Sequence, residues 1–185
     1  MTSKAAENSR KFLLRQAEDA AEKIVLKAIA EGDRTAFDDL YRGYYPRLTD
    51  FLGRLMPQHR EVVDEVINDT MYVVWTKAKT FRFESRLSTW IFGIAYKKAM
   101  KYFEKERRSR LEQMPEEWEL AIEDASDSAS KLQMQDSLMK ALAKLTPVQR
   151  SVIELTYEYG YSYSEIAKIM DCPENTIKTR MFHAR

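Results

Sequence analysis

Apolar side chains recur along most of this chain at the three- and four-residue spacing that places them on one face of an α-helix. Over residues 4–30 this spacing links Leu13 to Ile24, and Gly32 ends the segment. Asp33 is a good N-cap for the segment that follows. The pattern therefore predicts two consecutive helices that meet at a short turn.

The same spacing continues through the next eighty residues. The stripe of the second helix carries on beyond Pro46, and Pro57 suits the first turn of a third helix that ends near Ala78. Ser88 can cap a fourth helix, which we expect to run to about Arg108. The N-terminal half is thus predicted to be a small helical bundle.

The C-terminal part predicts a compact helical unit with a tight turn. Thr146 followed by Pro147 is an N-cap with proline at the first helical position. Ser162 and Glu165 have the spacing of a capping box, and a last helix is expected from about Pro173 to the end. The final two helices therefore have the layout of a helix-turn-helix.

Between the two helical parts the composition changes. Residues 111–130 carry seven Asp or Glu and no Lys or Arg, and Pro115 lies among them. A stretch of this kind buries too little apolar surface to order itself, so we interpret it as a linker. The expected organisation is as follows: a helical extension at 1–23, a first domain at 24–109, an acidic linker at 110–130 and a second domain at 131–185.

Composition supports an all-α fold with two small helical domains. Five Gly and five Pro among 185 residues are fewer than the turns of a β-rich fold require. A single Cys excludes an internal disulfide. Charges throughout the first thirty residues argue against a signal peptide, and no apolar run approaches the roughly 18 residues of a membrane span. We therefore expect a soluble, cytoplasmic protein without membrane insertion.

The sequence offers little for catalysis. It contains none of the short metalloprotease, phosphate-loop, dinucleotide-binding or serine-hydrolase motifs. The two histidines, His59 and His183, belong to different predicted domains and make a poor metal or acid–base pair. We expect no enzyme activity, no cofactor and no metal.

One acidic group stands out on the third helix. Its members share the face opposite the apolar stripe: Asp64, Glu65, Asn68 and Asp69. Such a group could hold a cation, but no histidine or further acid lies nearby. A protein-binding or solvated acidic face is the interpretation that we favour.

Positive charge is concentrated in the centre of the chain. Residues 76–110 contain eleven Lys or Arg and three Glu, a net charge of +8. Phe81, Phe83 and Trp90 are interleaved with these bases, which suits unstacked single-stranded nucleic acid better than a closed duplex. The alternatives are a solvated basic face and aromatic side chains that merely fill the core.

The last helix is amphipathic in the manner of a major-groove reader. Ile177 and Met181 share an apolar face, while Thr179 points almost opposite to it. Lys178 lies on one shoulder of this polar face, and Arg180 lies nearer the packed side. A polar face opposite a packed face is typical of helices that read base edges, although a plain helical hairpin shares the pattern.

Taken together, several stretches resemble a known family. Phe81-Arg82 followed by residues 89–95, then residues 162–167 and 172–180, are similar to the motif blocks of bacterial extracytoplasmic-function sigma factors of the sigma-70 family. The resemblance covers about residues 24–185 and has the expected order and spacing.

The resemblance implies a sigma factor that gives core RNA polymerase its promoter specificity. The acidic face (Asp64, Glu65, Asn68, Asp69) is then expected to bind the clamp of the largest catalytic subunit, and the flap of the second largest subunit is a further expected partner. Residues matching the −10 element readers are Phe81, Arg82, Phe83, Arg86, Trp90, Lys97 and Lys101. Residues matching the −35 element readers are Lys178, Thr179, Arg180, Phe182 and His183. An anti-sigma factor is implied as a regulatory partner.

This chain departs from the family pattern at four positions. Phe83 stands where Gly is usual, Lys97 and Asn175 where Asn and Gly are usual, and His183 where Arg is usual. Two other classes remain open on the sequence alone. These are a stand-alone helix-turn-helix transcriptional regulator and a helical adaptor whose basic face is simply solvated.

Overall fold

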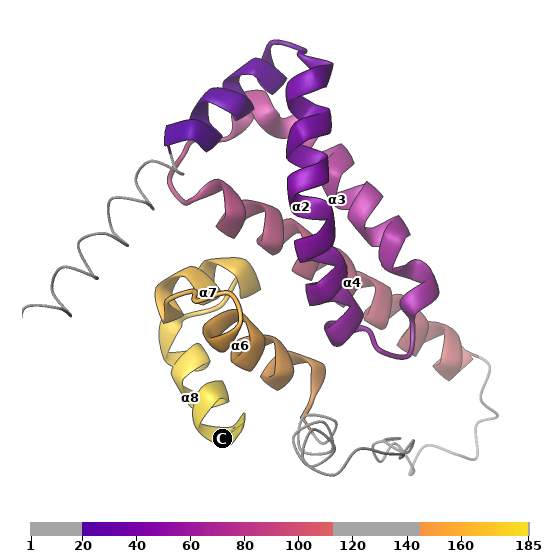
Figure 1. Ribbon diagram of the computed structural model, residues 1–185. Coiled ribbons are helices and arrows are strands. Elements are labelled where there is room, and N and C mark those ends of the chain that lie inside the picture. The colour runs from indigo at the N-terminus through magenta and orange to yellow at the C-terminus, as the bar shows by residue number, and fades with distance from the viewer. Residues whose placement is uncertain (1–19, 113–144, 185) are drawn as a thin grey trace, which may run out of the picture.

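The computed structural model describes residues 20–112 and 145–184, and all regular structure in these two ranges is helical (Figure 1). The first range contains a helical segment at residues 20–30, α2 (Arg34–Leu55), the 3₁₀ turn η1 (Arg60–Val62), α3 (Val63–Lys77), the 3₁₀ turn η2 (Ala78–Thr80) and α4 (Leu87–Glu112). The second range contains α6 (Pro147–Tyr157), α7 (Tyr163–Met170) and α8 (Glu174–Ala184). The all-α prediction is confirmed.

Local sequence signals account for the start of α2. Gly32 adopts a φ of +98°, which is favourable for a residue without a Cβ, and it ends the helical segment 20–30. The Asp33 side chain then accepts hydrogen bonds from the backbone N–H groups of Thr35 and Ala36. Pro46 lies inside α2 without ending it. All three features agree with the sequence prediction.

Two predicted helix starts are wrong. Pro57 lies in the turn after α2, not in the first turn of the next helix, and α3 begins only at Val63 after η1. The residue before a proline is disfavoured in the helical region, so Met56 leaves the helix at φ −119°, ψ 55°. Ser88 does not cap α4 either, because α4 begins at Leu87 and the Ser88 side chain is buried.

Several predicted segments fall at the edges of the described ranges. Helix α4 continues through residues 110–112, so the start of the expected linker 110–130 is helical. The rest of that linker, the N-terminal part of the extension 1–23 and residues 131–144 of the expected second domain lie outside the described residues.

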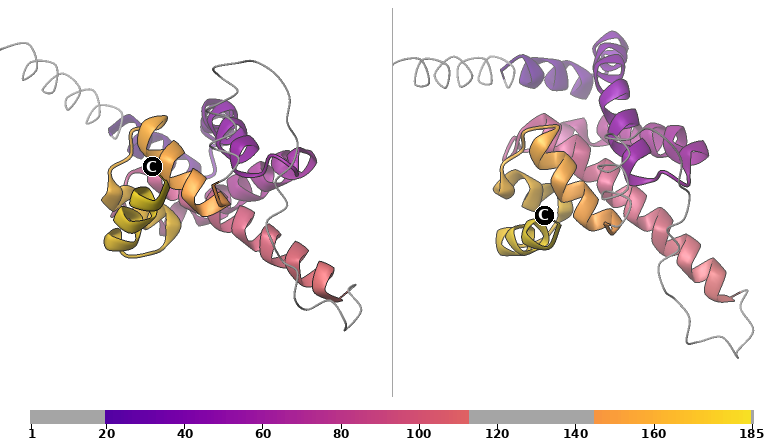
Figure 2. Two further views of the ribbon diagram at one scale, coloured as in Figure 1. Left: turned by 90° about the horizontal axis from the view of Figure 1, so that it is seen from below. Right: turned by 60° about the horizontal axis from the view of Figure 1, so that its bottom comes forward.

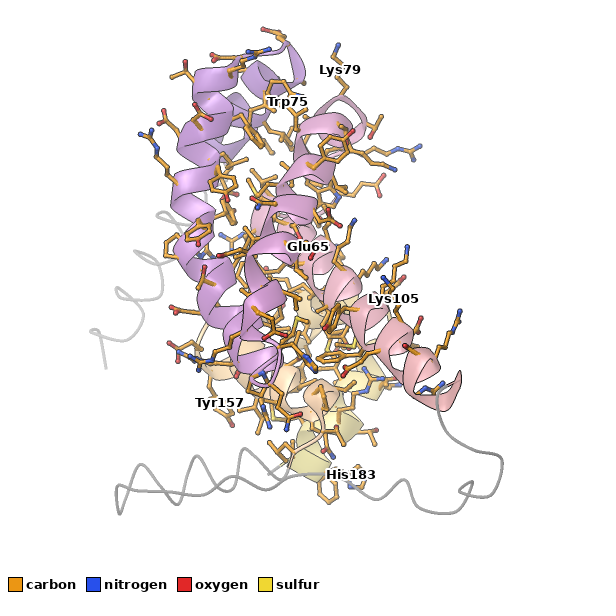
Figure 3. The ribbon with its side chains drawn as sticks, turned by 90° about the vertical axis from the view of Figure 1, so that its right-hand side faces the viewer. Glu65, Trp75, Lys79, Lys105, Tyr157 and His183 are labelled. Carbon is orange, nitrogen blue, oxygen red and sulfur yellow. The ribbon has the colours of Figure 1, made fainter. Side chains whose placement is uncertain are left out.

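The N-terminal helices pack together around a core of large apolar side chains. Helices α2 and α3 lie side by side with α4 packed against both, as Figure 3 shows from the side. Phe51, Ile67 and Phe92 are fully buried where these helices meet. Leu26 is also fully buried, so the helical segment 20–30 belongs to this core.

The C-terminal helices are short and strongly capped. Thr146 and Gln149 form a capping box at α6, and Ser162 and Glu165 form another at α7. Asp171 takes a left-handed conformation (φ 52°) and turns the chain from α7 into α8. The predicted helix-turn-helix layout is confirmed by this arrangement.

The two halves pack directly against each other. Helix α7 lies along α4 and α6 touches α2, and the two views of Figure 2 show the C-terminal helices beside the N-terminal bundle. The Tyr159 ring meets Phe92 at 5.0 Å and Phe51 at 6.2 Å between centroids, and Tyr161 meets Phe92 at 5.7 Å. One continuous apolar core therefore spans both halves. No helix within the described ranges is long and apolar enough to cross a membrane.

Candidate polymerase and nucleic-acid interfaces

The polar face of α3 is exposed over the whole predicted set: Asp64, Glu65, Asn68 and Asp69. Neighbouring helices orient three of these four side chains. The Tyr41 and Tyr45 hydroxyls donate to Asn68 Oδ1 at 2.9 Å and to Asp64 Oδ1 at 2.8 Å. Lys98 Nζ of α4 lies 2.8 Å from Asp69 Oδ2. Glu65 is labelled on α3 in Figure 3, and within the described residues it has no such partner.

Two tyrosines of α2 that sequence reasoning missed contact the acidic face. Tyr41 and Tyr45 are one helical turn apart on α2, and their rings stack at 5.7 Å with an interplanar angle of 22°. The hydrogen bond to the Asp64 carboxylate and its charge raise the pKa of Tyr45, while burial and then Asp64 raise the pKa of Tyr41. Both hydroxyls therefore keep their protons and remain donors. Their spacing of four residues is the signal that could have revealed them.

The cation-binding alternative for this face finds no support. Within the described residues there is no group of three or more His, Cys, Asp or Glu side chains that could hold a metal ion. The contacts that the structure gives this face are with tyrosine and lysine side chains.

The aromatic side chains before α4 form a short column. Phe81 stacks on Trp90 at 4.5 Å and 28°, and Phe83 meets the Phe81 ring edge-on at 4.9 Å. All three are half-buried, so they are neither fully solvated nor core residues. Phe83 has a φ of +56°, the region where glycine is favoured. This agrees with the glycine that is usual at this position in the family that the sequence resembles.

A pocket of about 350 Å³ opens beside this column. Its walls come from four elements: Glu22 and Lys23 of the helical segment 20–30, the loop residues 83–86, Leu87 at the start of α4, and Glu165 and Lys168 of α7. Lys23 Nζ lies 5.9 Å from the centre of the Phe83 ring. This volume lies at the lower end of the range of ligand pockets in proteins. The contribution of residues 20–30 to the pocket was not predicted from the sequence.

The basic residues of the loop and of α4 have different surroundings. Arg82 and Lys101 are exposed, whereas Arg86 is half-buried and reaches Glu165 of α7 at 3.9 Å. Lys97 Nζ lies 2.8 Å from Asp171 Oδ2 at the end of α7. The hydrogen bond from Lys97, followed by its charge, lowers the pKa of Asp171. Helix α7 thus covers part of the face that the sequence assigned to nucleic acid.

The predicted groove-reading face of α8 is open. Ile177 and Met181 are buried, whereas the side chains on the other face are exposed: Lys178, Thr179, Phe182 and His183. Phe182 retains 78% of its accessible surface, the largest fraction among the exposed large apolar side chains of the described residues. Arg180 is half-buried, and its Nη1 lies 3.5 Å from Cys172 Sγ. The distribution agrees with the helical geometry expected from the sequence.

Three local contacts shape this face. Thr179 Oγ1 donates to the Asn175 carbonyl at 3.0 Å, and Lys178 Nζ lies 3.0 Å from Glu174 Oε1 one turn earlier. The Phe182 and His183 rings meet edge-on at 5.5 Å. In Figure 3, His183 of α8 lies at the bottom of the molecule, whereas Glu65 of α3 lies near its middle. The α8 face and the α3 face are therefore presented on separate parts of the structure.

Comparisons with known proteins match the N-terminal and the C-terminal part of the chain separately. Residues 40–109 match the family model of sigma-70 region 2, and residues 135–185 match that of sigma-70 region 4. The sigma-E factor of Haemophilus influenzae, an ECF RNA polymerase sigma factor, is 26% identical over 91% of this chain and 94% of its own length. The ECF sigma factor SigM of Mycobacterium tuberculosis is 27% identical over 87% of this chain and 79% of its own length.

Solved structures show the same fold. The structure of CnrH in complex with the cytosolic domain of CnrY covers 89% of this chain and 92% of the matched chain, with a TM-score of 0.63 at 24% identity. The sigma factor RpoE of Bartonella quintana, crystallised with the anti-sigma factor NepR, covers 80% and 92% with a TM-score of 0.55 at 27% identity. Because both halves match sigma regions in the right order, a stand-alone helix-turn-helix regulator is not favoured. The chain belongs to the extracytoplasmic-function group of the sigma-70 family, and it is an alternative sigma factor that directs promoter-specific transcription.

Proposed function

We propose that this sigma factor works through three surfaces, each of which serves one partner. The acidic face of α3 binds the clamp of the largest core polymerase subunit. The loop 81–87 and the basic face of α4 take the −10 element, and α8 reads the −35 element. The chain supplies specificity and no catalytic residue, and it acts where polymerase and promoters are, in the cytoplasm.

The observation that supports the polymerase surface best is the way its side chains are held. Hydrogen bonds from Tyr41 and Tyr45 and the ion pair with Lys98 fix three of the four polar groups in place. A surface whose side chains are already ordered loses less entropy on binding. We infer that this preorganised acidic face meets basic residues of the polymerase.

The proposed −10 surface combines bases with stackable rings. Arg82, Arg86, Lys97 and Lys101 supply positive charge, and Phe81, Phe83 and Trp90 supply flat faces beside the pocket. Single-stranded nucleic acid is bound by this combination of a charged groove and aromatic platforms.

On α8, Thr179 and His183 are proposed to contact base edges, and Phe182 a thymine methyl group. Lys178 and Arg180 are proposed to contact phosphates. An anti-sigma factor is a further proposed partner, since two of the related sigma structures contain a bound protein, CnrY in one and NepR in the other.

A charge reversal at Glu65 tests the polymerase surface. Glu65→Lys leaves the tyrosine and lysine contacts in place and reverses one exposed charge. Affinity for core polymerase should fall, since an unfavourable charge at such an interface costs roughly 2–5 kcal/mol. The matched control is Asp39→Lys, because Asp39 is exposed and two residues before Tyr41, on another side of α2. Equal loss with both variants, or no loss with Glu65→Lys, would exclude this face as the polymerase contact.

A further inference from the structure

One wall of the pocket beside the aromatic column comes from outside the part of the chain that matches sigma-70 region 2. Glu22 and Lys23 belong to the helical segment 20–30, whereas that match begins at residue 40. We propose that Lys23 is a specificity-determining residue, and that it selects guanine when an unstacked base of the −10 element enters this pocket. The inference rests on the proposed −10 surface and adds a base preference to it.

The segment that carries Lys23 is fixed against the N-terminal helices. Leu26 is fully buried and Ile29 nearly so. The hydroxyl of Tyr44, a buried residue of α2, donates to Glu22 Oε1 at 2.7 Å. Burial and the charge of Glu22 raise the pKa of Tyr44, so its hydroxyl keeps its proton and remains a donor. The pocket wall is therefore held in place both by apolar packing and by this hydrogen bond.

An aromatic ring places the ammonium group of Lys23. Its Nζ lies 5.9 Å from the centre of the Phe83 ring, within the roughly 6 Å range of a cation–π contact. The Phe83 ring in turn packs edge-on against Phe81 at 4.9 Å. Lys23 is exposed, and within the described residues its ammonium group makes no hydrogen bond or ion pair. Its N–H donors are therefore available to a ligand in the pocket.

The charges of the pocket favour a neutral base over a phosphate group as the partner of Lys23. Glu22 and Glu84 line the same pocket, and their carboxylates would repel a phosphate there. An ammonium group can only donate hydrogen bonds. Guanine offers it two neighbouring acceptors, O6 and N7, whereas each of the other bases offers one at most on that edge. Guanine is therefore the base that Lys23 selects.

The test measures base preference, because a merely structural role of Lys23 would not change it. Polymerase holoenzyme selects open promoters from a library randomised over the −10 element, and the selected promoters are sequenced. Lys23→Met keeps an unbranched side chain and removes the donors, whereas Lys23→Arg keeps them. The matched control is Lys27→Met, because Lys27 is exposed one turn later on the same segment and does not line the pocket.

Holoenzyme with the wild-type chain should enrich guanine at one −10 position. Lys23→Met should reduce this enrichment by about fivefold, the lower end of what a good base contact provides. Lys23→Arg should retain it, and Lys27→Met should leave it unchanged. The proposal is overturned if the wild type shows no guanine enrichment, if Lys23→Met leaves the enrichment intact, or if Lys27→Met causes an equal loss.

A second measurement examines how Phe83 places the ammonium group. Phe83→Gly removes the ring and suits the left-handed backbone at this position. In that background Lys23→Met should have a smaller effect on the guanine enrichment, since the ammonium group is no longer held over a ring. An effect as large as in the wild-type background would contradict the placement of Lys23 by Phe83.

Failure of the proposed −10 surface would look different. Holoenzyme carrying Lys101→Ala would then open promoters as the wild type does, because no DNA strand would lie along α4. If Lys101→Ala impairs opening while Lys23→Met leaves the base preference unchanged, the −10 surface stands and the role of Lys23 is wrong.

Discussion

Phe83 combines an aromatic side chain with a backbone conformation that suits glycine. Its φ of +56° is costly for a residue with a Cβ, and its ring packs on Phe81 and lies beneath Lys23. The departure from the family's glycine thus places strain and an additional ring at the edge of the proposed −10 pocket. Backbone strain that persists at a binding surface is a recognised feature of functional sites.

A pair of substitutions separates the strain from the ring. Phe83→Ala removes the ring and keeps the strain, whereas Phe83→Gly removes both, so the glycine variant should be more stable than the alanine variant by about 1 kcal/mol. Urea unfolding of both proteins gives this difference. An alanine variant that is the more stable of the two would show that the left-handed conformation is not maintained in solution.

Glu154 is a second residue whose setting has a measurable consequence. It is buried on α6, and within the described residues its Oε2 has no hydrogen-bond partner. Burial raises the pKa of Glu154 from 4.5 to about 7, against the opposing influence of Arg54 and Arg150. The folded protein therefore binds this proton more tightly than the unfolded chain does.

The pH dependence of stability follows from that difference. Stability contributed by the Glu154 proton is fully present below pH 4.5, declines as the pH rises, and is lost above the folded pKa of about 7. Glu154→Gln cannot ionise, so relative to wild type it should gain on the order of 1–3 kcal/mol between pH 4.5 and pH 8. Urea unfolding at the two pH values measures this gain, and a constant difference between the proteins would mean that Glu154 is charged in the fold.

At the scale of elements, helix ends with a side-chain cap could be predicted and those without one could not. Asp33, Thr146 and Ser162 each accept backbone hydrogen bonds at the positions that the sequence indicated. Helices α3 and α4 begin differently. Helix α3 directly follows a 3₁₀ turn whose N-cap residue makes no side-chain hydrogen bond, and the candidate cap Ser88 is buried inside α4. A serine near a helix start is therefore an ambiguous signal when tertiary packing also favours burying it.

The buried and exposed faces of α8 could be predicted because the helical repeat of 3.6 residues alone determines which side chains share a face. His183→Arg should shift the preferred −35 sequence, since this side chain is proposed to contact base edges. Lys178→Ala should instead weaken binding to every sequence and reduce the salt slope by about one unit, since it removes one phosphate contact. Selection from a library randomised at the −35 element, with holoenzyme of each variant, distinguishes the two effects. An unchanged preferred sequence with His183→Arg would remove His183 from the base-reading set.

At the scale of the whole molecule, the sequence predicted two helical domains and their order but not the contact between them. Lys97 and Asp171 are 74 residues apart, and Lys168 and Glu84 are 84 apart. Pairs this distant leave no periodic pattern in a single sequence, and each of these residues also fits an exposed polar surface. Tyr159 and Tyr161 have the same ambiguity, because a tyrosine after a helix can lie in solvent as well as in an interface.

The most direct test of the central claim is transcription by core polymerase with and without this chain. Purified core enzyme is given a library of genomic fragments, and transcripts are sequenced in the presence and absence of this chain. The account predicts that the chain gives rise to transcripts that start downstream of one shared pair of −35 and −10 sequences. No new start sites with core enzyme, together with sequence-specific DNA binding by the chain alone, would contradict it.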